Sequence, residues 1–284
     1  MLRKLMKHEL LATGRIMLPM FALMLLAGVG GNLSTYQLLE TGNSFFNTVG
    51  VLLLMVFIVA IFATIILSYV LMIHRFHKNL LRDEGYLMMT LPVTVHEHIA
   101  AKLIVSVIWF TLTLLTVILS IFVLLFQAEP AMQFVREVGE VFGAVIKYQY
   151  GWHALLIGLE LLVLFAASLA GSCLMVYAAI AIGHSFSEHK TLLSFAAYFL
   201  MQGIMQVLGL LAANVSGKTY AHRMIDFFEN SMIQTTLADG TLLITPALAA
   251  THLLLLFAVA ASALFGAVFY AITAHFMTKK LNLN

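Results

Sequence analysis

Charged residues are scarce in this chain of 284 residues, and cysteine and proline are scarcer still. Only 10% of the residues are charged, whereas soluble domains carry about 25%. The hydrophobic share of 62% points the same way and excludes an ordinary water-soluble domain. The single cysteine, Cys173, excludes an intramolecular disulfide and a metal site built from several thiolates. Four prolines leave long stretches in which a helix can run without interruption.

Catalytic and nucleotide-binding motifs are also missing. The nearest approach to a P-loop, Ala212–Thr219, lacks the first glycine and follows an apolar stretch instead of a strand. His96-Glu97-His98 does not have the HExxH spacing of a zinc protease. We therefore expect the chain not to be an enzyme and to carry no cofactor, no metal and no nucleic-acid partner.

Six long apolar stretches with short polar connections dominate what is present. Each is about as long as the ~20 residues that a helix needs to cross the hydrocarbon core of a bilayer. Backbone amides in lipid cannot bond to water, so these stretches should be helices. The sequence predicts an all-α integral membrane protein, a single transmembrane domain over residues 1–284. The expected spans are residues 16–33, 49–72, 103–126, 154–182, 192–213 and 248–274.

The basic residues are distributed unequally between the two sides of the predicted membrane. Four of the fifteen fall on one side, and the other eleven fall on the side that holds both termini. The positive-inside rule then predicts a multi-pass protein of the cytoplasmic membrane with cytoplasmic N- and C-termini. The eleven are Arg3, Lys4, Lys7, Arg15, Arg75, Lys78, Arg82, Lys102, Lys190, Lys279 and Lys280; the four are Arg136, Lys147, Lys218 and Arg223.

Segments outside the spans add further expectations. Residues 1–15 have the pattern of an interfacial helix on anionic headgroups, although a simple basic flank of the first span explains them equally well. The outer loops are residues 127–153 and 214–247. Apolar residues recur at three- and four-residue steps in Ala131–Tyr148, which predicts an amphipathic helix. In the second outer loop, Tyr220–Ile233 fits a helix and Asp239-Gly240 fits the turn of a small hairpin.

The inward loop of residues 74–102 is the most informative segment. A basic helix is expected to continue out of the membrane and to end near Leu81. Two acidic residues and a glycine then break the helix, and a short apolar turn and Pro92 follow. Thr94 or a neighbour should cap the helix that returns to the bilayer. An apolar cluster on such a loop must lie under the bundle or dock on a partner protein. The cluster comprises Tyr86, Leu87, Met88, Met89 and Leu91.

The run Arg82-Asp83-Glu84-Gly85-Tyr86-Leu87-Met88-Met89-Thr90-Leu91-Pro92-Val93 resembles the coupling loop of type-2 ABC exporter permeases. The layout of an N-terminal helix, six spans and inward termini is also similar to that family, whereas the loop between the third and fourth spans is unusually long. The resemblance implies a coupling helix that inserts into a separate ATPase subunit. Its contact residues would be Asp83, Glu84, Gly85, Tyr86, Leu87, Met88, Leu91 and Pro92.

The resemblance further implies the partners and the cargo. Two copies of a cytoplasmic ATPase would carry ATP and magnesium, and a second permease subunit, identical or paralogous, would complete a dimer in contact with membrane lipids. The cargo would be hydrophobic or amphipathic, such as a lipid, a peptide or a drug. The sequence alone does not define which cargo is moved. A secondary transporter or channel without an ATPase, or the membrane anchor of a sensor or resistance complex, are the alternatives.

Polar residues inside the spans are the remaining candidates, because each is costly in lipid unless it faces protein or water. Tyr198, Gln202 and Gln206 recur every four residues, so they share one helix face that should point into the bundle or a dimer seam. Interhelical hydrogen bonding explains that face more simply than contact with substrate. Glu160 is the one acidic residue in the predicted spans. One interpretation places it at the outer interface beside Trp152 and His153 of the aromatic belt, and a substrate or proton role is the other hypothesis.

Overall fold

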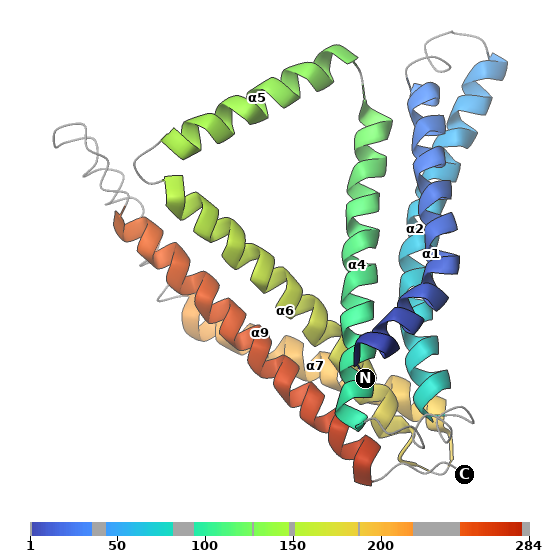
Figure 1. The fold of residues 1–284 in the computed structure, drawn as a ribbon, viewed down its shortest axis with the longest axis vertical. Coiled ribbons are helices and arrows are strands. Elements are labelled where there is room, and N and C mark those ends of the chain that lie inside the picture. Colours follow the sequence, from blue (N-terminus) through green and yellow to red (C-terminus); the bar gives the residue numbers. More distant parts are fainter. Residues whose placement is uncertain are drawn as a thin grey trace. The chain divides into compact units, whose positions relative to one another are not determined.

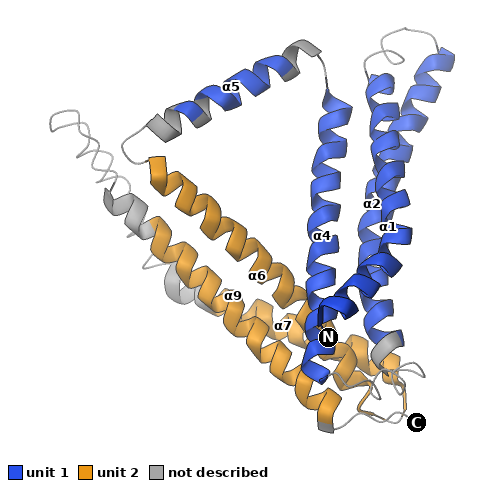
Figure 2. Cartoon of the chain, in the orientation of Figure 1, with its two compact units in different colours: residues 1–144, 283 blue, residues 145–282, 284 orange. Residues whose placement is uncertain are grey.

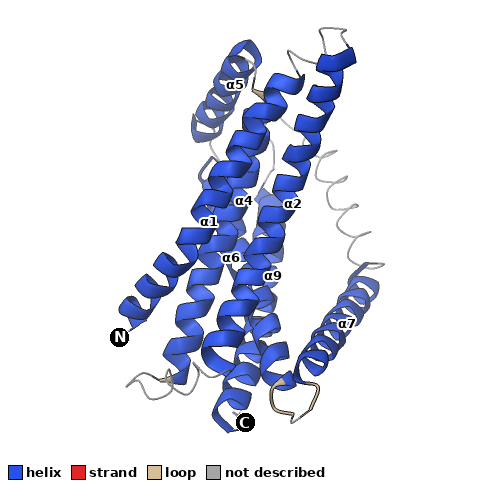
Figure 3. Ribbon diagram, turned by 90° about the vertical axis from the view of Figure 1, so that its right-hand side faces the viewer, coloured by secondary structure: helices blue, strands red, loops and turns tan. Residues whose placement is uncertain are grey.

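The computed structural model describes most of the chain, and its described segments are all helices and short turns (Figure 3). The chain consists of two compact units with a boundary after Ala144, and Figure 2 shows them in different colours. Unit 1 contains α1, α2, α4 and most of α5, and unit 2 contains α6, α7 and α9. The described residues are 2–35, 44–81, 94–126, 128–147, 151–186, 188–217 and 245–279.

Unit 1 is built around α1 (Leu2–Leu33), which packs against both α2 (Ser44–Leu81) and α4 (Val95–Leu125). Figure 1 shows these three helices running side by side. The buried residues of α1 recur at steps of three and four, as a single packed helix face requires. They are Glu9, Thr13, Gly14, Met17, Phe21, Met24, Gly28 and Gly31.

Small residues allow α1 to approach α4 closely. A Cβ atom added to Gly28 would lie 2.9 Å from the backbone oxygen of Ser120, so no side chain fits at that position. Asn32 then binds the end of α4: its side-chain amide donates to the carbonyl oxygens of Leu124 at 2.9 Å and Phe126 at 2.8 Å. These are among the carbonyls that a helix end leaves without an intrahelical donor. The contact fixes α1 and α4 at this end of the unit.

The start of α4 is capped as the sequence predicts. The Thr94 hydroxyl accepts from the Glu97 amide at 3.3 Å, and the Glu97 carboxylate accepts from the Thr94 amide at 3.2 Å. This reciprocal pair is a capping box, which satisfies two amides at the helix start. Glu97 therefore has a local structural role at the start of α4.

The predicted amphipathic helix is confirmed as α5 (Ala128–Lys147). Its described side chains from Met132 to Glu140 are all exposed, including the apolar Phe134 and Val135. The expected helix at Tyr220–Ile233 and the hairpin around Asp239 lie outside the described residues.

Unit 2 is built around α6 (Gly151–Gly183), which packs against α7 (Lys190–Gly217) and α9 (Thr245–Lys279). Figure 1 shows α6 and α9 running side by side. The chain turns closely after α6: a Cβ atom on Gly183 would lie 2.7 Å from the Lys190 carbonyl oxygen. His189, just before α7, has a φ of 52°, a left-handed conformation that is uncommon outside glycine. The P-loop imitation beginning at Ala212 is helical through Gly217.

Six of the described helices are long and apolar enough to cross a membrane, which agrees with the six predicted spans. The helices extend past the predicted spans at nearly every end. The apolar pattern indicates only the part of a helix that lies in lipid, and the polar residues that flank this part continue the same helix. In α1, the expected surface helix and the first span form one continuous helix that contains Pro19. Its helices therefore identify the chain as an all-α, multi-pass membrane protein.

Candidate functional site

The predicted coupling contacts lie outside the described residues, so the structure places their two flanks and not the contacts themselves. The flanks are the end of α2 and the start of α4. The contact residues concerned are Asp83, Glu84, Gly85, Tyr86, Leu87, Met88, Leu91 and Pro92.

A buried charge cluster connects these two flanks to α1. The Lys102 ammonium of α4 donates to the Glu9 carboxylate of α1 at 2.7 Å, and an Arg75 guanidinium nitrogen of α2 lies 3.7 Å from the same carboxylate. The side chains of Lys102 and Glu9 are only 3% and 8% exposed, whereas Arg75 is 27% exposed. One carboxylate therefore holds three helices together where little water can screen the charges.

A hydrogen-bond chain fixes the position of Glu9 along α4. The Trp109 indole nitrogen donates to the Thr13 hydroxyl at 2.6 Å, and that hydroxyl donates to the Glu9 carbonyl oxygen at 2.7 Å. Trp109 also packs against Phe21, with ring centroids 6.0 Å apart. These contacts hold the turn of α1 that carries Glu9, so the carboxylate is fixed opposite Lys102.

This cluster is not among the sites predicted from the sequence, where Arg75 and Lys102 serve only as basic residues that indicate topology. A signal was present, because Glu9 is the one acidic residue in the otherwise basic segment of residues 1–15. Its partners, Arg75 and Lys102, are 66 and 93 positions further along the chain. The local sequence around Glu9 therefore does not predict which residues it contacts.

A second polar cluster lies in unit 2 and contains Glu160. The Nδ1 atom of His252 on α9 lies 2.9 Å from both carboxylate oxygens of Glu160 on α6. The Nε2 atom of the same imidazole lies 3.0 Å from Nδ1 of His153, near the start of α6. Glu160 and His252 are 15% and 16% exposed. Neither this cluster nor any other group of three or more His, Cys, Asp or Glu side chains among the described residues is placed to hold a metal ion.

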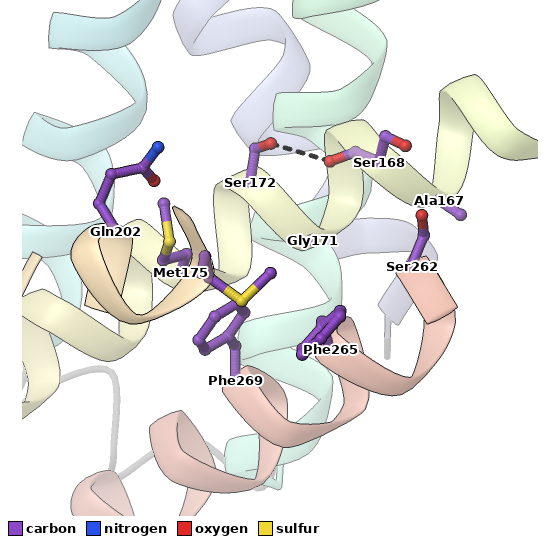
Figure 4. Close-up of a pocket in the computed structure, with 10 residues that line it drawn as sticks. Ala167, Ser168, Gly171, Ser172, Met175, Gln202, Ser262, Phe265 and Phe269 are labelled. Carbon is purple, nitrogen blue, oxygen red and sulfur yellow. Dashed lines mark hydrogen bonds between the residues drawn. The ribbon is translucent and has the colours of Figure 1, made fainter. Parts of the chain in front are cut away.

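The face predicted on α7 is divided by the structure. Gln202 lines a cavity of about 240 Å³ between α6, α7 and α9 (Figure 4), whereas Gln206 is exposed and Tyr198 is half-buried. On one side of the cavity, the Ser172 hydroxyl donates to the Ser168 carbonyl oxygen at 2.9 Å. The other lining residues are Ala167, Gly171, Met175, Met205, Ser262, Phe265 and Phe269.

Gly171 of α6, which lines the cavity, lies next to Gly266 of α9. A Cβ atom on Gly266 would lie 3.8 Å from the Gly171 Cα atom. No large side chain fills the adjoining space, so hydroxyl groups and the aromatic rings of Phe265 and Phe269 face the same volume. Such a space suits a small group with one polar and one apolar side. The buried thiol of Cys173 is on the same helix but does not line the cavity.

The features above define the class of this protein as a multi-pass α-helical membrane protein with polar clusters between its helices. Comparison with known proteins finds no matching family model, no matching curated protein and no matching solved structure.

Proposed function

We propose that the chain is the membrane-spanning permease subunit of an ATP-driven exporter of the ABC class. It would lie in the cytoplasmic membrane with both termini inside and move a hydrophobic or amphipathic molecule outward. The nucleotide would be hydrolysed by two copies of a separate ATPase subunit, and a second permease subunit would complete the pathway. The support comes from the sequence of the inward loop and from the charge cluster at its base.

The observation that carries the proposal is that Glu9 contacts both ends of the segment at residues 74–102. Arg75 lies at the beginning of this segment and Lys102 lies at its end. A loop that only connects two spans needs no such support. A loop that transmits force does, because displacement at its tip is lost unless its base is rigid.

Electrostatics explains why the base of the loop is rigid. Separating a buried ion pair leaves an uncompensated charge, which costs about 3–5 kcal/mol. Thermal motion therefore rarely separates Glu9 from Lys102. A push on the loop would then move the adjoining ends of α1, α2 and α4 as one body, and packed helices respond to such a push by switching between discrete arrangements.

A secondary transporter is the second candidate, and one observation favours it. Glu160 is bound to an imidazole inside a candidate span, and ionisable residues in such positions often belong to proton or ion pathways. The two candidates differ in their energy source. An ABC permease requires ATP and a partner ATPase, whereas a secondary transporter works alone with an ion gradient.

The decisive experiment uses the affinity-tagged chain purified from its native membrane and reconstituted into vesicles. We expect vanadate-sensitive ATP hydrolysis to co-purify with it. Leu87→Asp should remove at least about 90% of that hydrolysis, because a carboxylate cannot be buried in an apolar docking groove. Membrane insertion of the variant should be unchanged.

The matched control is Leu237→Asp, which makes the same chemical change in the second outer loop. It should leave the co-purified hydrolysis at the wild-type level. Normal hydrolysis with Leu87→Asp would overturn the proposed docking surface. Full transport by the chain alone, with an ion gradient and no nucleotide, would overturn the ABC assignment and favour the secondary transporter.

A further inference from the structure

The cluster of Glu160, His252 and His153 has no part in the coupling argument, and its geometry indicates a use of its own. All three residues belong to unit 2, with two on α6 and one on α9. Glu160 lies about 14 Å along α6 from Gly151, given a rise of 1.5 Å per residue. It therefore belongs to the apolar helix Gly151–Gly183, one of the six candidate spans.

The hydrogen-bond geometry of the three side chains allows two positions for one shared proton. The Nδ1 atom of His252 must carry a hydrogen to bond to an ionised Glu160. The Nε2 atom of His252 and the Nδ1 atom of His153 are 3.0 Å apart, and that bond needs one hydrogen, on either nitrogen. The same heavy-atom geometry therefore accommodates two positions of the shared proton.

The two positions correspond to different charges on the cluster. With both imidazoles neutral, the shared proton is on His153 and the cluster has a charge of −1. A proton from water that binds Nε2 of His153 lets the shared proton pass from Nδ1 of His153 to Nε2 of His252. His252 is then an imidazolium beside an ionised Glu160, His153 is neutral again, and the cluster has no net charge.

Other ionisable groups described in these helices are far from Glu160. On α6 and the turn after it they are Cys173, Tyr177 and His184, and the first of these is thirteen positions further along the helix, about 20 Å at helical rise. On α7 they are Lys190 and Tyr198, and Lys190 lies beside Gly183 at the far end of α6. On α9 they are Tyr270, His275 and Lys279. No permanently charged side chain described in α6, α7 or α9 therefore compensates Glu160.

We propose that Glu160, His252 and His153 form a proton-binding site that takes up one proton through His153 and holds it as the imidazolium of His252. Uptake strengthens the contact between α6 and α9, because an ion pair replaces a hydrogen bond between a carboxylate and a neutral ring. Under the topology proposed above, the site takes its proton from outside, so external acidity would tighten this pair of helices. The site itself does not depend on that topology or on the ATPase.

The test is a pH titration of the purified full-length protein in lipid nanodiscs, followed by NMR of histidines labelled with ¹⁵N. His252 and His153 should titrate together as a coupled pair. Glu160→Gln should reduce the proton affinity of the pair by at least about tenfold, because it removes the neighbouring negative charge. His153→Gln, at a half-buried position, is the second variant if Glu160→Gln does not fold, and it should remove the coupling from the His252 signal.

The matched control is His275→Gln, which removes an exposed imidazole from the same helix α9. It should leave the signals of His252 and His153 unchanged. Independent titration of the two rings, or a Glu160→Gln variant that binds protons as tightly as the wild type, would overturn the proposal. Because no nucleotide or partner is used, a negative result would not bear on the permease assignment.

Discussion

Each compact unit contains a carboxylate that joins helices, and the two carboxylates differ in their partners. Glu9 in unit 1 is bound by Lys102, with Arg75 nearby, and lysine and arginine are the most basic classes of side chain. Glu160 in unit 2 is bound by His252, whose class of side chain gains and loses its charge near neutral pH. The first arrangement gives a permanent connection, and the second gives one whose strength depends on protons.

This difference agrees with the positions of the two clusters. The permanent pair lies at the base of the loop that we propose receives force, where a rigid connection is needed. Glu160 and its histidine partners lie towards the starts of α6 and α9, within unit 2. Substitutions that alter one cluster or one helix contact at a time test this difference.

The largest effect is expected from Lys102→Met, which leaves the buried Glu9 carboxylate without its closest partner. The free energy of unfolding in detergent should fall by about 3–5 kcal/mol. Lys7→Met is the control, since Lys7 is an exposed lysine near the start of α1, and it should change stability by less than about 0.5 kcal/mol. Equal stability of the two variants would show that Glu9 and Lys102 do not hold unit 1 together.

A smaller effect is expected from glycine substitutions that compare helix packing in the two units. Gly28→Ala places a Cβ atom 2.9 Å from the Ser120 backbone oxygen, so α1 and α4 must move apart, at about 1–3 kcal/mol. Gly171→Ala would place its Cβ atom at an ordinary 3.9 Å from the Ser262 carbonyl oxygen. It should be neutral or stabilising by up to about 1 kcal/mol, because alanine favours helices.

Thermal unfolding of both glycine variants in the same detergent measures this comparison. A loss of stability in Gly171→Ala as large as in Gly28→Ala would show that the backbones of α6 and α9 lie as close together as those of α1 and α4.

The most specific effect, no larger than that of Gly28→Ala, is expected from Lys102→His, which gives unit 1 the kind of partner that unit 2 has. The imidazolium pairs with Glu9 at low pH, and the pairing is lost as the ring deprotonates, so stability should fall as pH rises. Between about pH 5 and pH 8 the variant should lose about 1–3 kcal/mol more than the wild type. Unfolding curves at both pH values measure this loss, and a parallel response of the two proteins would contradict the electrostatic explanation.

The six spans and several local features could be predicted from the sequence, because each depends on residues that are close together in the chain. Lipid requires every backbone amide to bond within its own helix, so a long apolar stretch is sufficient evidence for a span. The Thr94 cap depends on Glu97, three positions away. The amphipathic face of α5 follows from helical periodicity in the same way.

The polar clusters depended on the tertiary structure. Glu9 and Lys102 are 93 positions apart, and Glu160 and His252 are 92 apart. Periodicity shows which side of a helix is polar, but it does not show which other helix will face that side. In a membrane this choice depends on close packing at small residues such as Gly28 and on polar contacts between helices, since lipid contributes no hydrophobic preference for one partner over another. The sequence therefore determined what crosses the membrane, and the packing of helices decided which charges meet.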